Sequence, residues 1–181
     1  MASSGTTSFN ITIDEVIEEA YERCGVRTNA GNDIRSARRS LNLLFSEWGN
    51  RGINLWKVKS KTETLVNGSI TYNTPSDCND VLEAVVTTTG GTQQSLTKVS
   101  RSEYIAIPNK SATGTPSQYY VDRQITPTIS LYLAPDTSAV TNIFYYYLAR
   151  IEDVGAYTNT SDMPFRFFPC MVSGLAFYLS Q

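Results

Sequence analysis

Residues 37–64, ARRSLNLLFSEWGNRGINLWKVKSKTET, contain the change of pattern that decides the fold. Up to Trp48 the apolar residues recur at three- and four-residue intervals. This spacing predicts an amphipathic helix over residues 32–48, with Gly49 as its C-terminal stop. From Leu55 onward the pattern alternates with a period of two, which is typical of a strand. The stretch therefore predicts a helical N-terminal part followed by a β-rich part.

Toward the N-terminus, a similar apolar pattern predicts another helix over residues 12–24. Thr12 and Glu15 have the spacing of a capping box, and the helical pattern lasts until Gly25. We expect the two helices to pack as an antiparallel pair. The other face of the first helix is negatively charged, so it should be solvated or meet a basic partner. Its carboxylates belong to Asp14, Glu15, Glu18, Glu19 and Glu22.

Three arginines, Arg35, Arg38 and Arg39, lie near the start of the second predicted helix. Cations at this end of a helix oppose the helix dipole, so their partners are expected elsewhere. The acidic face of the first helix and a neighbouring subunit are both candidates. Contacts with DNA phosphates are less favoured, because five carboxylates lie one helix away. We treat both charged sets as candidate interface residues.

Residues 55–149 are predicted to be mostly β. Asn67-Gly68 is a hairpin signal that predicts pairing of the strand after Leu55 with residues 69–72, and Gly90-Gly91 predicts a second hairpin. Lysines on the first strand predict a sheet edge, where charge discourages stray pairing. The other expected elements are strands over residues 118–123, 128–134 and 139–149, and a short helix between Ser100 and Pro108.

The predicted loop over residues 109–117 suits contacts between subunits, with Lys110 and Thr113 as candidates. Its end is no phosphate loop, because it lacks the GxxxxGK[ST] spacing and leads into a strand. Tyr119 and Tyr120 follow, part of a tyrosine-rich set that also includes residues 145–147. These rings suit stacking on sugars or bases, but we favour packing and an oligomer interface. Alternation turns some rings inward, and no basic groove accompanies them.

A closing helix is predicted over residues 163–181, with Pro169 within or just after its first turn. Because no C-terminal cap precedes Gln181, we expect more chain to follow in the natural protein. The fold class is α+β: an N-terminal helical pair, a β-rich middle of hairpins and a C-terminal helix. At 181 residues we expect one domain spanning residues 1–181.

Composition excludes several kinds of function. The net charge is −2 and the pI about 5.2, which argues against a protein that grips nucleic acid phosphates. The chain has no histidine, which removes the usual triads, zinc sites and proton shuttles, and we expect no cofactor or metal. Cys24, Cys78 and Cys170 are widely spaced, which favours a reducing compartment. No apolar run predicts a membrane span, so we expect a soluble protein made in a cytoplasm.

Three stretches together resemble the head-to-tail adaptor family of podoviruses, also called tail tubular protein A or the portal-proximal tail tube. They are residues 37–56 (ARRSLNLLFSEWGNRGINLW), residues 99–136 (VSRSEYIAIPNKSATGTPSQYYVDRQITPTISLYLAPD) and residues 163–181 (MPFRFFPCMVSGLAFYLSQ). With the N-terminal helix, the resemblance covers most of the chain in order. No position matches a catalytic residue, so no active site is carried over.

The resemblance implies a virion protein that is assembled in the host cytoplasm. It implies a ring, commonly a dodecamer, between the portal protein and the tail nozzle or tube. DNA would leave through the lumen without specific binding, since a weakly acidic wall lets a polyanion slide. The acidic face of the first helix is expected to line or rim that channel, or to meet a basic portal surface.

Other functions stay open from the sequence. A different tail-tube or head-completion component is the first alternative, and docking to portal would separate it from the adaptor. A carbohydrate-binding β module that uses the tyrosines is the second, and glycan binding by the monomer would favour it. An enzyme such as a glycosidase with two carboxylates is the third, but five carboxylates on one exposed face are more typical of a charged surface.

Overall fold

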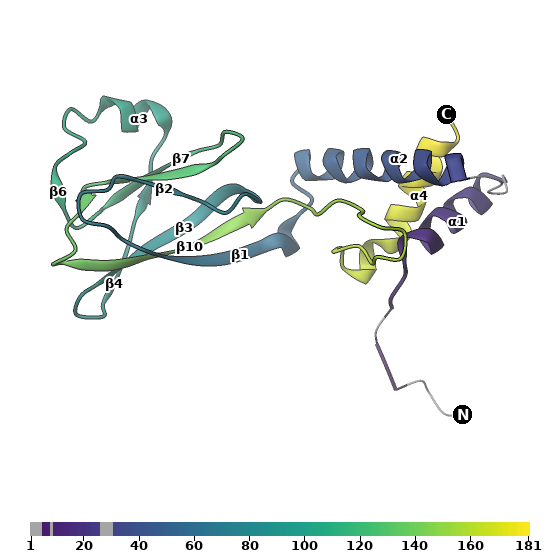
Figure 1. Cartoon of the computed structure of the whole chain (residues 1–181), viewed down its shortest axis with the longest axis horizontal. Coiled ribbons are helices and arrows are strands. Elements are labelled where there is room, and N and C mark those ends of the chain that lie inside the picture. The colour runs from purple at the N-terminus through teal and green to yellow at the C-terminus, as the bar shows by residue number, and fades with distance from the viewer. Residues whose placement is uncertain (1–4, 8, 26–30) are drawn as a thin grey trace. The chain divides into compact units, whose positions relative to one another are not determined.

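The chain folds into two compact units, each with its own hydrophobic core. The computed structural model describes residues 5–7, 9–25 and 31–181. The helical unit comprises residues 1–56 and 151–181, and the β unit comprises residues 57–150. The predicted α+β class is confirmed (Figure 1). The buried side chains form two clusters, because the segment between the second and the last helix closes a sandwich of its own. The expectation of one domain over residues 1–181 stays a prediction.

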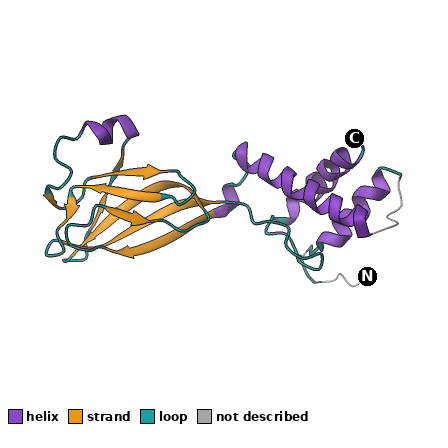
Figure 2. Ribbon diagram, turned by 45° about the horizontal axis from the view of Figure 1, so that its top comes forward, coloured by secondary structure: helices purple, strands orange, loops and turns teal. Residues whose placement is uncertain are grey.

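The described part of the helical unit contains three α-helices. They are α1 (Ile13–Arg23), α2 (Gly31–Asn50) and α4 (Phe168–Leu179), and the 3-10 turn η2 (Phe165–Phe167) precedes α4 (Figure 2). Both α1 and α2 contact α4 more extensively than they contact each other, so the C-terminal helix completes the expected pair. A Cβ atom on Gly174 would lie 2.8 Å from Leu44 Cδ2, which shows how closely α4 approaches α2.

The first helix begins where the capping box predicts. Thr12 is the N-cap, and its backbone N–H donates to the Glu15 carboxylate at 2.7 Å. Two further N–H groups of the first turn, on Ile13 and Asp14, donate to carbonyl groups of Asn159 and Tyr157 at 3.0 and 3.1 Å. The helix ends before Gly25, whose φ of 72° is the left-handed conformation that glycine adopts readily.

The second helix runs past its predicted stop. Gly49 lies inside α2, and the glycine that terminates the helix is Gly52, with φ 75°. The N–H of Gly52 donates to the Gly49 carbonyl at 3.1 Å, and the N–H of Ile53 donates to the Trp48 carbonyl at 3.0 Å. These two bonds form a Schellman motif, which satisfies the last carbonyl groups of the helix.

The last helix begins later than predicted. Residues 163 and 164 lie outside any helix, residues 165–167 form the 3-10 turn, and α4 proper begins at Phe168. Pro169 lies in the first turn, where its missing N–H removes no intrahelical hydrogen bond. Among the described residues, none of the helices combines the length and hydropathy that a bilayer span requires.

The β unit, all of whose residues are described, is a sandwich of two four-stranded sheets. The first sheet has the order β1-β10-β3-β4 and the second β2-β8-β7-β5, and their buried side chains form one cluster. The strands are β1 (Val58–Thr64), β2 (Thr71–Asn73), β3 (Cys78–Thr88), β4 (Gln93–Ser95), β5 (Thr97–Lys98), β6 (Thr113–Gly114), β7 (Gln118–Asp122), β8 (Thr128–Tyr132), β9 (Ala134–Pro135) and β10 (Val140–Ala149). The short turn η1 (Leu55–Lys57) precedes β1.

The predicted hairpin across Asn67-Gly68 is wrong in its pairing. The turn itself forms, with Gly68 at φ 73° and a Ser69 N–H bond to the Val66 carbonyl at 3.0 Å. However, β1 pairs with β10 and β2 pairs with β8. Because β1 and β2 belong to different sheets, this turn carries the chain from one sheet to the other. The Gly68 N–H donates to the Pro135 carbonyl at 2.9 Å.

Two further hairpins and the short helix form as predicted. β3 and β4 form the hairpin around Gly90-Gly91, and β7 and β8 form the next. The short helix α3 (Arg101–Ala106) has Ser100 and Glu103 as a capping box and ends before Pro108. The loop over residues 109–117 is more constrained than expected, because β6 within it pairs with β9.

The register between β1 and β10 explains the lysine-rich strand. β1 is an edge strand, as predicted, and Lys59 and Lys61 lie opposite the buried Tyr147 and Tyr145. Residues opposite each other share a face, so these lysines lie on the inner side of the sandwich rim. Lys59 Nζ forms an ion pair with Asp77 at 2.9 Å. Inward charges of this kind protect an edge from pairing with another strand.

Candidate assembly surfaces

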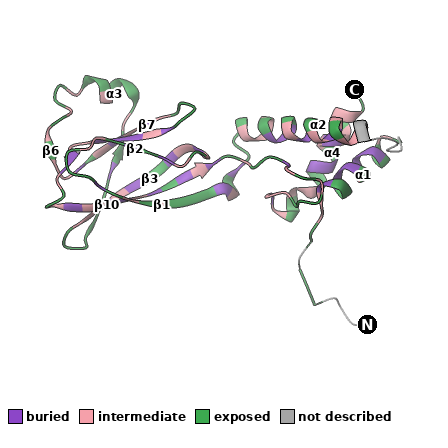
Figure 3. Ribbon diagram, viewed as in Figure 1, coloured by how far each residue is buried: buried purple, intermediate pink, exposed green. Residues whose placement is uncertain are grey.

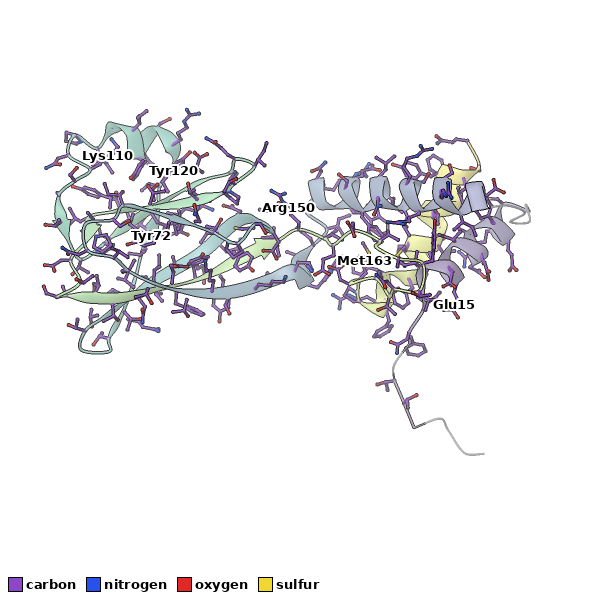
Figure 4. The ribbon with its side chains drawn as sticks, viewed as in Figure 1. Glu15, Tyr72, Lys110, Tyr120, Arg150 and Met163 are labelled. Atoms are coloured by element: carbon purple, nitrogen blue, oxygen red, sulfur yellow. The ribbon has the colours of Figure 1, made fainter. Side chains whose placement is uncertain are left out.

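The acidic face of α1 divides into carboxylates with internal roles and carboxylates open to solvent. Hydrogen bonds from the backbone and side chain of Thr12 lower the pKa of Glu15, which is part of the helix cap (Figure 4). Glu19 forms an ion pair with Arg23 at 2.9 Å. Asp14 is exposed and accepts a bond from the Glu15 N–H at 3.1 Å. Glu18 and Glu22, one turn apart, are exposed, on the side of α1 opposite its buried residues. Figure 3 shows that α1 has both buried and exposed positions.

The three arginines of α2 line an open groove of about 330 Å³ together with Asn42, Leu43 and Tyr157. The Arg38 guanidinium lies over the Tyr157 ring, 5.6 Å from its centre, which holds it by a cation–π contact. Arg35 and Arg39 are exposed one turn apart. Within the described chain none of the three forms an ion pair, so the acidic face of α1 in the same chain is not their partner.

Lys110, expected at an interface, has an intramolecular role. Its Nζ donates to the carbonyl groups of Ile105 and Ile107 at 3.1 and 2.9 Å, at the C-terminal end of α3. The same group lies 5.6 Å from the centre of the Tyr104 ring. Lys110 therefore caps α3 and folds the loop back on it (Figure 4). Thr113 lies in β6 and is exposed, so it stays a candidate contact.

The two consecutive tyrosines have different environments. Tyr119 is 1% exposed, and its hydroxyl donates to the Leu82 carbonyl at 3.0 Å. Burial raises its pKa to about 12. β7 turns this ring into the core, so the ring is not exposed for the interface contact that was expected of it. Tyr120 lies on the other face of β7 and stacks on Tyr104 of α3, with ring centres 5.3 Å apart.

Burial also weakens the idea of a tyrosine platform for sugars or bases. Tyr145 and Tyr147 are buried, whereas Tyr146 between them is 46% exposed. Alternation along β10 leaves only every second ring outside. A stacking surface would need several neighbouring rings on one exposed face, and these three do not provide it.

Sequence reasoning missed an apolar outer face on the sheet that contains β10. Val58, Leu82 and Tyr146 are each more than two-fifths exposed, and Phe144 packs edge-on against Tyr146 at 5.1 Å. The alternation of residues 143–147 indicates two faces, but it does not say which one is outside. The outer face can be identified only from the structure, in which β10 pairs with β1 and β3.

A histidine-free chain that exposes charged helix faces and an apolar sheet face has the surface of a protein that works by binding. In the described ranges, no group of three or more acidic or thiol side chains is placed to hold a metal ion. The sequence matches the model of the SU10 adaptor protein family over residues 11–180, and the chain belongs to this family. Comparison with curated proteins gives no significant match.

The match passes through both units, from just before α1 to the end of α4. The chain is therefore a structural adaptor of a phage and a component of the virion. The resemblance that residues 37–56, 99–136 and 163–181 indicated is confirmed at this level.

Proposed function

We propose that this chain is a ring-forming subunit of the connector between the head and the tail of a short-tailed phage. In this function it docks to the portal protein on one side and to the tail nozzle or tube on the other. DNA is retained and then ejected through the lumen. The observation that carries the proposal is the extent of the family match, which runs through both compact units from residue 11 to residue 180.

The construction of the chain supports this function. Two units with separate cores offer separate surfaces, so contacts with different partners need not compete for one site. A closed ring requires that each subunit present two different, complementary surfaces to its neighbours. The charged faces of α1 and α2 and the apolar face of the first sheet are unlike one another, as such contacts require.

The charge of the chain suits the passage of DNA. With a net charge of −2, the ring has no overall excess of cations to condense on phosphates. Affinity for DNA grows with the number of phosphates that lysine and arginine neutralise, because each contact releases counterions. We therefore expect DNA to pass the lumen without being held by it.

Native mass spectrometry and negative-stain imaging of the purified protein test the proposal, first alone and then with the portal protein of the same phage. A closed ring, or a ring that appears only on portal, is the expected result. A protein that stays monomeric in both conditions would rule out the connector function. Docking to a tail ring but not to portal would make it a different tail component.

A further inference from the structure

Unpaired charge distinguishes the groove on α2 from a larger depression in the β unit. This open depression, about 610 Å³, is lined by Lys98, Arg101 and Arg123 among others. Two of these cations are already neutralised, because Asp80 binds Lys98 at 2.8 Å and Arg123 at 2.7 Å. The groove on α2 has three guanidinium groups, and no described carboxylate pairs with any of them.

The groove also has an apolar centre. Leu43 is 56% exposed beside Arg39, and the ring of Tyr157 forms part of the wall. Arginine and tyrosine are enriched at the energetically important positions of protein interfaces, where the surrounding contacts exclude water. The groove therefore fits a partner surface whose side chains combine a carboxylate with an aliphatic stem.

The acidic side of α1 has these properties. Glu18 and Glu22 are exposed and separated by four residues, as are Arg35 and Arg39 on α2. A separation of four residues is about 6 Å along a helix axis, so two such pairs match in spacing. The CH₂ groups of glutamate can cover the Leu43 side chain while the carboxylates reach the guanidinium groups.

These two surfaces do not meet within one chain. Each lies on the side of its helix that faces away from the common core of α1, α2 and α4. We propose that the groove of α2 binds the acidic face of α1 in a second copy of the chain. Because the two surfaces differ, the contact runs head to tail and can close a ring. The inference rests on the proposed connector function and names a subunit contact within it.

A second copy is favoured over DNA as the occupant. Three arginines with one exposed leucine form a small site, whereas phosphate binding of useful affinity needs an extended basic surface. The overall charge of −2 also repels a polyanion at long range. The acidic face, in contrast, is present in the same stoichiometry as the groove in every assembly of this chain.

Charge reversal tests the contact. The groove variant carries Arg35→Glu and Arg39→Glu, and the face variant carries Glu18→Arg and Glu22→Arg. Each alone places like charges across every subunit contact, so we expect ring formation to weaken by at least about tenfold in protein concentration. The control variant, Arg101→Glu with Arg166→Glu, makes the same charge change as the groove variant at exposed positions outside the groove and should assemble like wild type.

Mixing the two variants gives the sharper result. The acidic groove of the groove variant fits the basic α1 face of the face variant. The unaltered groove of the face variant fits the unaltered α1 face of the groove variant. Only unlike subunits can therefore be neighbours. An equimolar mixture should therefore recover rings in which the two variants alternate, which is possible when the subunit number is even, as in a dodecamer. Native mass spectrometry with one variant isotope-labelled measures the alternation as a 1:1 composition.

The outcomes separate this inference from the connector proposal. Both are measured under the condition, alone or on portal, in which the wild type forms rings, with circular dichroism to confirm that the variants are folded. Failure of the wild type to form a ring in either condition overturns the connector function. If the wild type forms a ring, three results overturn the α1–groove contact. They are normal ring formation by the groove and face variants, loss of ring formation by the control variant, and no recovery of rings in the mixture. Wild-type binding to DNA that only the groove variant loses would also overturn it.

Discussion

At the scale of single residues, two buried tyrosines in the β unit differ in whether the hydroxyl group forms a hydrogen bond. Tyr119 and Tyr145 are each 1% exposed in the same core. The Tyr119 hydroxyl donates to the Leu82 carbonyl, whereas the Tyr145 hydroxyl has no hydrogen-bond partner among the described residues. Burial raises the pKa of both phenols, to about 12 for Tyr119, so both stay protonated in the folded protein at neutral pH.

We expect opposite responses when each hydroxyl is removed. Tyr119→Phe loses a buried hydrogen bond and should lower the free energy of unfolding by about 1 kcal/mol. Tyr145→Phe removes a buried polar atom that gains nothing from burial, so it should be neutral or slightly stabilising. Denaturant unfolding, followed by tyrosine fluorescence, measures both. Equal losses in the two variants would contradict the difference in hydrogen bonding.

A carboxylate in the helical unit makes stability depend on pH. The hydrogen bond from Tyr178 and the attraction of Arg51 lower the pKa of Glu47 below its ordinary value of 4.5. A lowered pKa means that folding favours the ionised form, so the contribution is complete above pH 4.5 and is lost as the pH falls through the folded value. We expect Glu47→Gln to flatten the acid side of the stability profile, measured by melting temperature against pH. Glu18→Gln is the matched control, and an unchanged slope in Glu47→Gln would contradict the assignment.

At the scale of elements, local signals predicted what is local. Helix starts follow from side chains three residues apart, as at Thr12 and Ser100, and the hairpins around Gly90-Gly91 and between β7 and β8 need only neighbouring residues. The partner of β1 lies about eighty residues away in β10, and no short-range rule reaches it. For the same reason the alternation of Tyr119 and Tyr120 predicted opposite faces, but not which ring is buried.

The candidate site was predictable to the same extent. The charged faces of α1 and α2 follow from helical spacing, and the structure places them where that spacing puts them. The intramolecular role of Lys110 could not be predicted, because it depends on a loop that folds back on α3. The groove needed Tyr157, which lies over a hundred residues from Arg38 in sequence and contacts it only after the chain returns from the β unit.

The end of α2 gives a test at this scale. Gly52 has a positive φ in the Schellman motif, so Gly52→Ala should cost about 1 kcal/mol of stability. Gly49 lies inside the helix, and a Cβ there would meet only Ile151 Cδ1 at 4.0 Å, so Gly49→Ala should stabilise by about 0.5–1 kcal/mol. Thermal unfolding of both variants decides between the two glycines. If Gly49 were the stop that the sequence predicted, the signs would be reversed.

At the scale of the whole molecule, the chain is a sandwich inserted into a helical unit. The β unit is one continuous segment, whereas the helical unit is formed by residues before and after it. Val58 pairs with Leu148, so the chain enters and leaves the β unit at neighbouring positions of one sheet. An insertion with adjacent ends lets each unit fold around its own core without straining the other.

This construction predicts that residues 57–150 fold when expressed alone. The segment contains both sheets and the complete buried cluster, and it has a size at which single domains commonly fold. We expect a β-type circular dichroism spectrum, dispersed amide resonances and one cooperative thermal transition. The matched control is the same segment with Val81→Asp, which places an unpaired charge in the core and should abolish the transition. A segment that is unfolded or aggregated without that substitution would mean that the sandwich depends on the helical unit for its stability, and that the two cores form as one cooperative structure.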